Sequence, residues 1–128
     1  MAERRKTSEI LQELSENVDG YVGASIVGQD GMSIANHVVE RGFNEDKAAA
    51  SLSQLVRQAA ESSEAMDAGE FEETITTSQK YMFLTRPLGN GKFFIQLILR
   101  SDGNLGAARM YLEDYEDELL DTLPRSAR

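Results

Sequence analysis

The chain has 128 residues, of which 13 are basic and 22 acidic, so its formal net charge at pH 7 is -9. This length suits one domain with one core, and the acidic balance argues against nucleic acid as the main partner, because phosphate contacts need lysine and arginine. The absence of cysteine excludes disulfides and zinc–cysteine sites. The charged start lacks an apolar signal segment, and no apolar run approaches the roughly 20 residues of a membrane helix. We therefore expect a cytoplasmic protein that does not insert into membranes.

The first part of the chain predicts a helix followed by a hairpin. The helix is expected to run to about Asn17, with Thr7 or Ser8 as its cap. Residues 21–27 (YVGASIV) are apolar and small on both faces, which is typical of a central strand covered on both sides. An Asp-Gly turn signal then leads into a short second strand at residues 32–37.

Residues 44–66 predict the longest helix, because they contain no glycine and no proline. Asn44 can cap its start, and the acidic residues that follow suit the positive end of the helix dipole. Apolar residues at spacings of three and four predict the face that covers a sheet: Ala48, Leu52, Leu55, Ala59 and Met66. A second stripe is small enough for another backbone to approach closely or for water to cover it: Ala49, Ser53, Val56 and Ala60.

Three more strands are predicted, at residues 71–77, 80–88 and 92–100. The first alternates polar and apolar residues and is only half apolar, which suits an edge strand. The last, KFFIQLILR, is the most apolar and should be central, and an Asn-Gly hairpin signal precedes it. A final helix capped by Asp102 is expected to continue to Pro124.

The last helix carries an acidic stripe, defined as Glu113, Asp114, Glu116, Asp117, Glu118 and Asp121. Acids towards a helix C-terminus oppose the dipole, and Arg109 four residues before Glu113 offsets only about 0.3 kcal/mol. The pattern favours a solvated face, with a docking surface for a basic partner as the alternative.

The predicted order is helix, strand, strand, helix, three strands and helix, which is an α+β fold with a five-stranded antiparallel sheet. One domain over residues 7–124 is expected between tails at residues 1–6 and 125–128. This order resembles the Roadblock/dynein light chain family, within it the short MglB-type bacterial and archaeal members. The resemblance rests on GASIVGQDGMSIA (23–35), the alanine-rich helix after it, and LGNGKFFIQLIL (88–99) with its Asn-Leu-Gly opening of the last helix.

The resemblance implies a long helix on one face of the sheet and the first and last helices on the other. It also implies a homodimer in which the strand after the long helix pairs with its copy and the long helices lie side by side. The half-polar edge strand and the small-residue stripe fit such a twofold interface. The residues expected there are Ala49, Ser53, Val56, Ala60, Phe71, Glu73, Ile75 and Thr77.

Family members of this kind bind small Ras-like GTPases, and MglB-type dimers promote GTP hydrolysis by reshaping the GTPase's own site. The resemblance thus implies a non-enzymatic regulator without a cofactor, in a setting of cell polarity or motility. The GTPase would meet the polar side of the long helix: Lys47, Ser51, Gln54, Arg57, Gln58 and Glu61. Arg57 could serve as an arginine finger, although a solvated helix arginine is the favoured interpretation.

Two other functions stay open. A dimeric adaptor would hold a larger complex together without sensing nucleotide. A ligand sensor would need polar residues inside the core strands, where Gln96 is the only clear one in the last strand. A single histidine, His37, predicts neither a metal site nor a catalytic site.

Overall fold

A computed structural model describes residues 5–128, and the predicted α-β-β-α-β-β-β-α order is confirmed. The helices are α1 (Thr7–Asn17), α2 (Glu45–Ala65) and α3 (Leu105–Asp121), and a short 3₁₀ turn, η1, follows at Arg125–Ala127. The strands are β1 (Tyr21–Gly28), β2 (Ser33–Val38), β3 (Thr74–Thr77), β4 (Tyr81–Leu88) and β5 (Phe93–Arg100).

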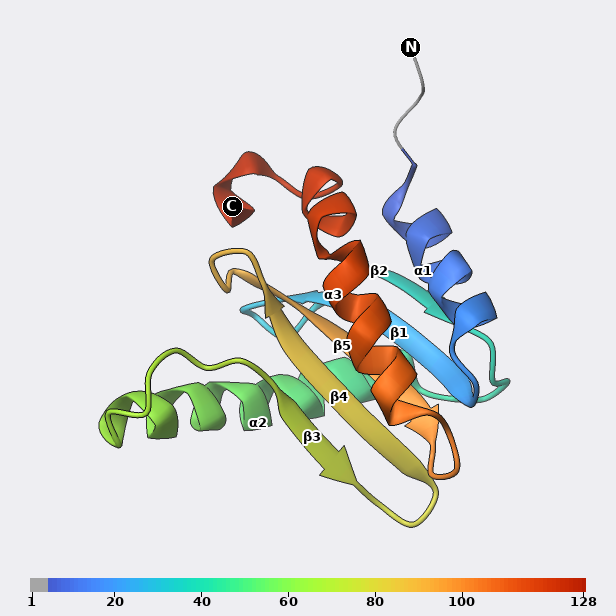
Figure 1. Ribbon diagram of the computed structural model, residues 1–128, viewed down its shortest axis with the longest axis horizontal. Coiled ribbons are helices and arrows are strands. Elements are labelled where there is room, and N and C mark those ends of the chain that lie inside the picture. Colours follow the sequence, from blue (N-terminus) through green and yellow to red (C-terminus); the bar gives the residue numbers. More distant parts are fainter. Residues whose placement is uncertain (1–4) are drawn as a thin grey trace.

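The strands form one antiparallel sheet in the order β2-β1-β5-β4-β3. As predicted, the most apolar strand, β5, is central, and the half-polar strand β3 lies at an edge. The helix α2 lies across one face of this sheet, while α1 and α3 cover the other (Figure 1). The α+β fold class expected from the sequence is therefore confirmed.

The hydrophobic core lies between the sheet and the pair α1 and α3. Every second residue of the inner strands points into it, as the two-residue period of a strand requires. The sheet contributes Ala24, Ile26, Leu84, Ile95, Leu97 and Leu99, and the helices contribute Ile10, Leu11, Leu14, Ala108, Leu112, Leu119 and Leu120.

Both outer helices begin with caps other than those predicted. For α1 the backbone N–H of Lys6 donates to Glu9 Oε1 at 3.0 Å, and Thr7 already lies inside the helix. For α3 the cap is Asn104, whose side-chain oxygen accepts from the backbone N–H of Ala107 at 3.0 Å. Asp102 was predicted as that cap, but it lies two residues too early to reach the first turn of the helix.

The C-terminal residues predicted as a tail pack onto the β4–β5 hairpin. The Asn90 backbone N–H donates to the carbonyl of Ala127 at 2.9 Å, and its side-chain amide donates to the carbonyl of Ser126 at 2.6 Å. Ala127 is fully buried. A Cβ at Gly89, where φ is +56°, would collide with the Ala127 carbonyl. Residues 125–127 therefore belong to the domain, because glycine in the hairpin makes room for them.

The start of the described chain is also anchored. Of the tail predicted at residues 1–6, positions 1–4 lie outside the described residues. Arg5 pairs with Glu118 of α3 at 2.6 Å and with Glu13 of α1 at 3.0 Å. This arginine joins the two helices that cover the core.

Candidate interaction surface on helix α2

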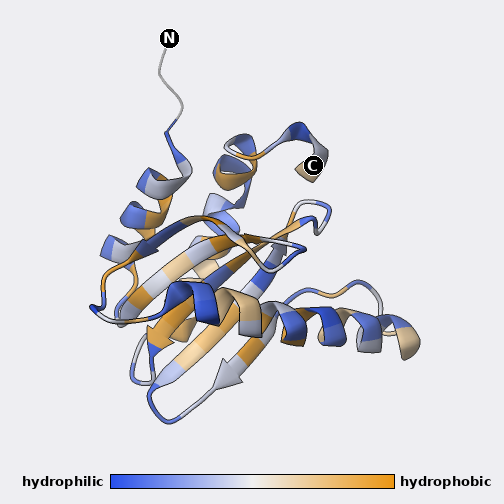
Figure 2. Cartoon of the chain, turned by 180° about the vertical axis from the view of Figure 1, so that it is seen from behind, coloured by the Kyte–Doolittle hydropathy of each residue, from blue (hydrophilic) through white to orange (hydrophobic). Residues whose placement is uncertain are grey.

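The helix α2 starts as predicted and crosses the sheet above β1 and β2. The side-chain oxygen of Asn44 accepts from the Lys47 backbone N–H at 3.0 Å, so Asn44 is the cap. In both views the C-terminal half of α2 extends beyond the sheet (Figures 1 and 2). The helix therefore exposes two flanks as well as its outer side.

The side of α2 that faces the sheet agrees with the predicted one at Leu52, which is 8% exposed, but otherwise differs from it. The buried residues are Glu45, Ala49, Leu52, Ser53 and Val56. Of the predicted sheet-facing residues, Leu55 is 49% exposed and Met66 is 70% exposed. Spacings of three and four showed correctly that these residues share a side, but the neighbouring side meets the sheet.

The small-residue stripe serves the chain's own sheet. A Cβ at Gly31, in the β1–β2 turn, would lie 2.9 Å from Ser53 Oγ, so this turn and α2 are in close contact. Ala49 and Val56 are likewise almost completely buried. The prediction that Ala49, Ser53 and Val56 receive a second helix is thus wrong, because these side chains are already covered within one chain.

All six residues predicted to meet a partner lie on the solvent side of α2 and are exposed. They are Lys47, Ser51, Gln54, Arg57, Gln58 and Glu61. The Arg57 guanidinium donates to the backbone carbonyl of Gln29 at 3.4 Å, which places it beside the β1–β2 turn. Exposure makes these residues available to a partner, and their role in binding stays a prediction.

One flank of α2, called here the apolar flank, consists of Ala48, Leu55, Ala59 and Met66. Helix geometry of about 100° per residue puts these four on one line. Ala48 and Ala59 are half-buried, whereas Leu55 and Met66 are mostly exposed. The described residues leave Leu55 49% and Met66 70% exposed, so this flank has apolar surface that another molecule could cover.

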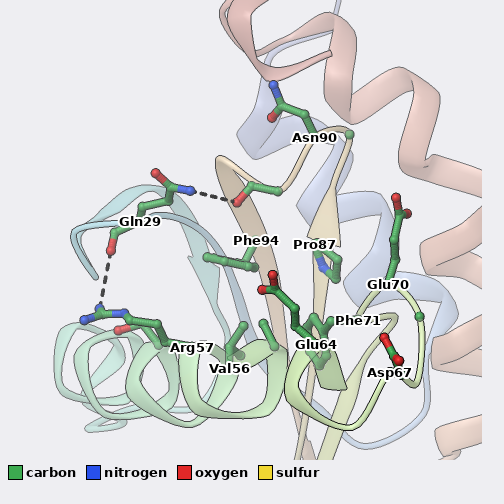
Figure 3. Close-up of a pocket in the computed structure, with 15 residues that line it drawn as sticks. Gln29, Val56, Arg57, Glu64, Asp67, Glu70, Phe71, Pro87, Asn90 and Phe94 are labelled. Atoms are coloured by element: carbon green, nitrogen blue, oxygen red, sulfur yellow. Dashed lines mark hydrogen bonds between the residues drawn. The ribbon is translucent and has the colours of Figure 1, made fainter. Parts of the chain in front are cut away.

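The opposite flank borders a groove of about 1140 Å³ between α2, the segment after it and the β4–β5 hairpin (Figure 3). Its apolar lining includes Val56, Ala60, Phe71, Pro87 and Phe94, and its acidic lining comprises Glu64, Asp67 and Glu70. The Gln29 side chain reaches across one end towards the Gly91 carbonyl at 3.5 Å. Arg57 lines the same groove, so its charged lining is three acids and one arginine, and it suits apolar groups beside polar ones.

The edge strand β3 is shorter than predicted. Residues 71–77 alternate as a strand would, but only Thr74–Thr77 pair with β4. Phe71 lines the groove on the α2 side, whereas Glu73 Oε1 pairs with Arg109 of α3 at 2.5 Å on the other side. These two residues therefore lie on opposite sides of the sheet, although both were expected at one dimer interface. Ile75 is 41% exposed and Thr77 is exposed, so both remain available at the edge.

Arginines from elsewhere in the chain meet the acidic stripe of α3. Glu118 pairs with Arg5 at 2.6 Å, Glu113 lies 3.7 Å from Arg86, and Asp121 pairs with Arg128. Arg109, expected to offset Glu113, pairs instead with Glu73 on the edge strand side. The stripe is therefore partly neutralised by the fold.

Sequence reasoning missed a group of buried polar residues beneath α2. Ser25 and Gln96 are fully buried, Thr85 is 1% exposed and Glu45 is 7% exposed. Only Gln96 stood out, because serine and threonine in a strand are unremarkable until the register brings them together. The sequence signal that was available is the small pair Gly23 and Ser25 on one face of β1.

Residues 5–128 contain neither a metal-binding cluster nor a membrane-spanning helix. No group of three or more histidine, cysteine, aspartate or glutamate side chains there is placed to hold a metal ion. No helix in the same range is long and apolar enough to cross a membrane.

Comparison with solved structures gives close matches to the fold. MglB of Myxococcus xanthus has a TM-score of 0.79 at 15% identity, over 94% of this chain and 96% of that chain. The gliding protein MglB from Thermus thermophilus has a TM-score of 0.77 at 13% identity, over 91% and 87%. MglC of Myxococcus xanthus has a TM-score of 0.67 at 25% identity, over 90% and 97%.

No curated protein sequence matches the chain. The profile of the Roadblock/LC7 domain matches residues 7–99, which includes everything from α1 to the end of β5 except its last residue. The sheet order and the placement of α2 opposite α1 and α3 agree with the architecture that the resemblance implied. The chain belongs to the Roadblock/LC7 domain family.

Proposed function

We propose that this protein is a cytoplasmic homodimer that binds and regulates a small Ras-like GTPase without catalytic residues of its own. The observation that carries the proposal is the apolar flank of α2, where Leu55 and Met66 are exposed beside a polar helix surface. These two side chains lie about 16 Å apart along one line of the helix, with half-buried Ala59 between them, and an exposed apolar line of this kind favours an interaction site. A solved relative described as MglB with a tetrameric arrangement, with a TM-score of 0.80 at 14% identity, supports association between copies.

In the proposed dimer the apolar flank replaces the small-residue stripe as the helix contact. The strand β3 supplies the second contact, because its outer edge has no neighbouring strand among residues 5–128. Ile75 and Thr77 are its exposed side chains. A twofold axis beside β3 would extend the sheet from one copy into the next and bring the two overhanging helices together.

The GTPase would contact the outer side of α2 through Lys47, Ser51, Gln54, Arg57, Gln58 and Glu61. Because the Arg57 guanidinium already binds the Gln29 carbonyl, we expect it to support the β1–β2 turn rather than enter a nucleotide site. The dimer would then act by holding the GTPase in a conformation that brings the GTPase's own catalytic groups into place.

The dimer is tested by changing one exposed residue in each contact. Ile75→Lys and Leu55→Glu should each shift the mass in analytical ultracentrifugation from dimer towards monomer, because each places a charge in an apolar contact. Met110→Glu is the matched control, since Met110 is 52% exposed on α3, in the opposite layer. Dimers that persist in both variants would place the interface elsewhere.

The regulator is tested with the protein as bait in a lysate whose GTPases are held in the GTP form or the GDP form. A regulator should capture a small GTPase from one pool only, and purified partner should then hydrolyse GTP at an altered rate. Lys47→Glu should weaken capture, whereas Lys6→Glu, which reverses an exposed charge beside α1, should not. Equal capture from both pools would instead support the adaptor.

One observation supports the alternative function of a ligand sensor. Its requirement for polar residues inside the core strands is met by Ser25, Thr85 and Gln96. None of these three lines the groove, however, because α2 covers them. A sensor would show a melting temperature that rises with ligand concentration.

A further inference from the structure

A row of polar side chains crosses the sheet on the side of α2. The strand registers place one residue of each strand side by side, in the order Asn36, Ser25, Gln96, Thr85 and Thr74. The three inner members are buried, and Gln96 Nε2 points to the backbone carbonyl of Ala49 in α2 at 3.5 Å. The contact between α2 and the sheet is thus polar at its centre.

The first residue of α2 places a carboxyl group over this row. Glu45 is 7% exposed, and its Oε2 lies 3.5 Å from the position of a Cβ at Gly23 in β1. The carboxyl group therefore lies directly against the backbone of β1. Four buried oxygens at this contact have no hydrogen-bond partner: Ser25 Oγ, Gln96 Oε1 and both carboxyl oxygens of Glu45.

The charged groups around Glu45 offer no compensating cation. Asp46, in the same turn, is acidic, and Tyr21 of β1 donates its hydroxyl to the His37 carbonyl at 2.6 Å. In the connection before α2, Glu40 pairs with Arg100 and accepts from Tyr81. Arg41 and Lys47 are exposed, and no salt bridge among the described residues includes Glu45.

We propose that Glu45 is a proton-linked latch, whose protonated carboxyl group holds the first turns of α2 on the sheet. A neutral carboxyl group has one O–H donor, and this donor supplies the partner that Ser25 Oγ or Gln96 Oε1 lacks. An ionised carboxylate offers only acceptors to a site with too few donors, so its burial is costly. Loss of the proton therefore favours release of this turn into water.

The pKa of Glu45 moves in the direction that this latch requires. Burial raises it above the ordinary value of 4.5, the nearby Ser25 hydroxyl lowers it in part, and Asp46 adds to the rise. Because the pKa is higher in the folded state than in the unfolded state, the neutral carboxyl group stabilises the fold fully at pH below the unfolded-state pKa. This stabilisation is lost as pH rises through the folded-state pKa. The latch is closed in acid and opens with rising pH. It operates within one chain and does not depend on the proposed dimer or GTPase.

Glu45→Gln tests the latch because glutamine keeps the shape, stays neutral at every pH and carries N–H donors. We expect the melting temperatures of wild type and variant to coincide near pH 4 and to diverge above it, with the variant a few degrees higher at pH 8. Glu61→Gln is the matched control, because Glu61 is an exposed acid on the outer side of the same helix. Its melting temperature should follow that of wild type across the pH range. Parallel curves for wild type and Glu45→Gln would overturn the proposal.

Hydrogen exchange of the wild-type protein gives a second test that needs no variant. After correction for intrinsic exchange, the opening constant of amides in residues 48–53 should rise with pH, by at most tenfold per unit because one proton is linked. Amides of β5, residues 95–99, are the internal reference, because they exchange only through global unfolding and their opening constant should stay far below that of residues 48–53 at every pH. Protection in α2 that is independent of pH would overturn the latch even if Glu45→Gln does not fold.

Discussion

The two faces of the sheet are built from different chemistry, although they share every strand. Gln96 and Leu97 are neighbours in β5 and point to opposite sides. Leu97 pairs with Ala24 and Leu84 in an apolar row beneath α1 and α3, whereas Gln96 lies in the polar row beneath α2. Apolar residues are buried beneath α2 as well, among them Val27, Val56 and Ile98, so the two layers differ in the polar row at the centre of the α2 contact. We expect this row to make α2 the less tightly held layer.

The ion pairs follow the same division. On the side of the sheet covered by α1 and α3, four arginines pair with acids and so connect the chain ends and the strands to α3. They are Arg5, Arg86, Arg109 and Arg128. Among the described residues no salt bridge includes a residue of α2, whose nearest equivalent is the bond from Arg57 to the Gln29 carbonyl. Exposed ion pairs stabilise only weakly one by one, so their shared location matters more than their number.

The largest expected effect comes from exchanging the chemistry of the two faces within β5. Leu97→Gln would bury an amide in the apolar core and should lower the free energy of unfolding by about 4 kcal/mol. Gln96→Leu removes an unpartnered acceptor and one long hydrogen bond, so it should raise this free energy by up to about 1 kcal/mol. Urea denaturation of both variants measures the contrast. Similar losses would show that both faces are packed equally tightly.

A smaller loss of stability should separate two glycines of the β4–β5 hairpin. Gly89 packs against the C-terminal turn, whereas Gly91 faces open space. Gly89 and Gly91 both have positive φ, so alanine at either position costs about 1 kcal/mol in backbone strain. Only at Gly89 does the added Cβ meet the Ala127 carbonyl, whereas the space around Gly91 is open. We expect Gly89→Ala to cost roughly twice as much as Gly91→Ala. Faster release of C-terminal residues by carboxypeptidase from Gly89→Ala alone would identify the displaced turn.

The architecture could be predicted from sequence because local signals and hydrophobic pattern agreed. The Asn-Gly signal placed the β4–β5 hairpin, Asn44 was correctly chosen as a cap, and the apolar run of β5 correctly predicted a central strand. Asp102 was wrong because two candidate caps lay close together, and only the turn geometry decides which one reaches the first free N–H groups.

The candidate surface was predictable in part. The polar side of α2 was found, since Lys47, Gln54 and Arg57 are exposed as expected. Helical spacing groups residues into sides but does not say which of two adjacent sides meets the sheet, and the small residues of β1 and its turn decide that. Glu45 looked like an acid that favours the helix start. Its burial depends on the position of α2 above Gly23, which no local pattern reveals.

The smallest expected effect is a pH response of opposite sign on the two faces. Glu13 accepts from the Tyr115 hydroxyl at 2.5 Å and pairs with Arg5 at 3.0 Å, and these contacts lower its pKa from the ordinary 4.5. Because the pKa is lower in the folded state, the ionised carboxylate stabilises the fold at pH above the unfolded-state pKa. This stabilisation is lost as pH falls through the folded-state pKa. Glu13→Gln should therefore melt slightly lower than wild type at pH 7, and the difference should shrink in acid.

The paired comparison with Glu45→Gln makes this small shift informative. That variant should melt above wild type, and its difference should also vanish in acid, so at neutral pH the two differences have opposite signs. Burial and the bond to Glu13 raise the pKa of Tyr115 to about 12, so this tyrosine keeps its proton throughout the range. A difference of the same sign for both carboxyl groups would mean that they lie in similar surroundings. In that case the two carboxyl groups would not support the proposed contrast between a tightly paired α1–α3 side and a loosely held α2.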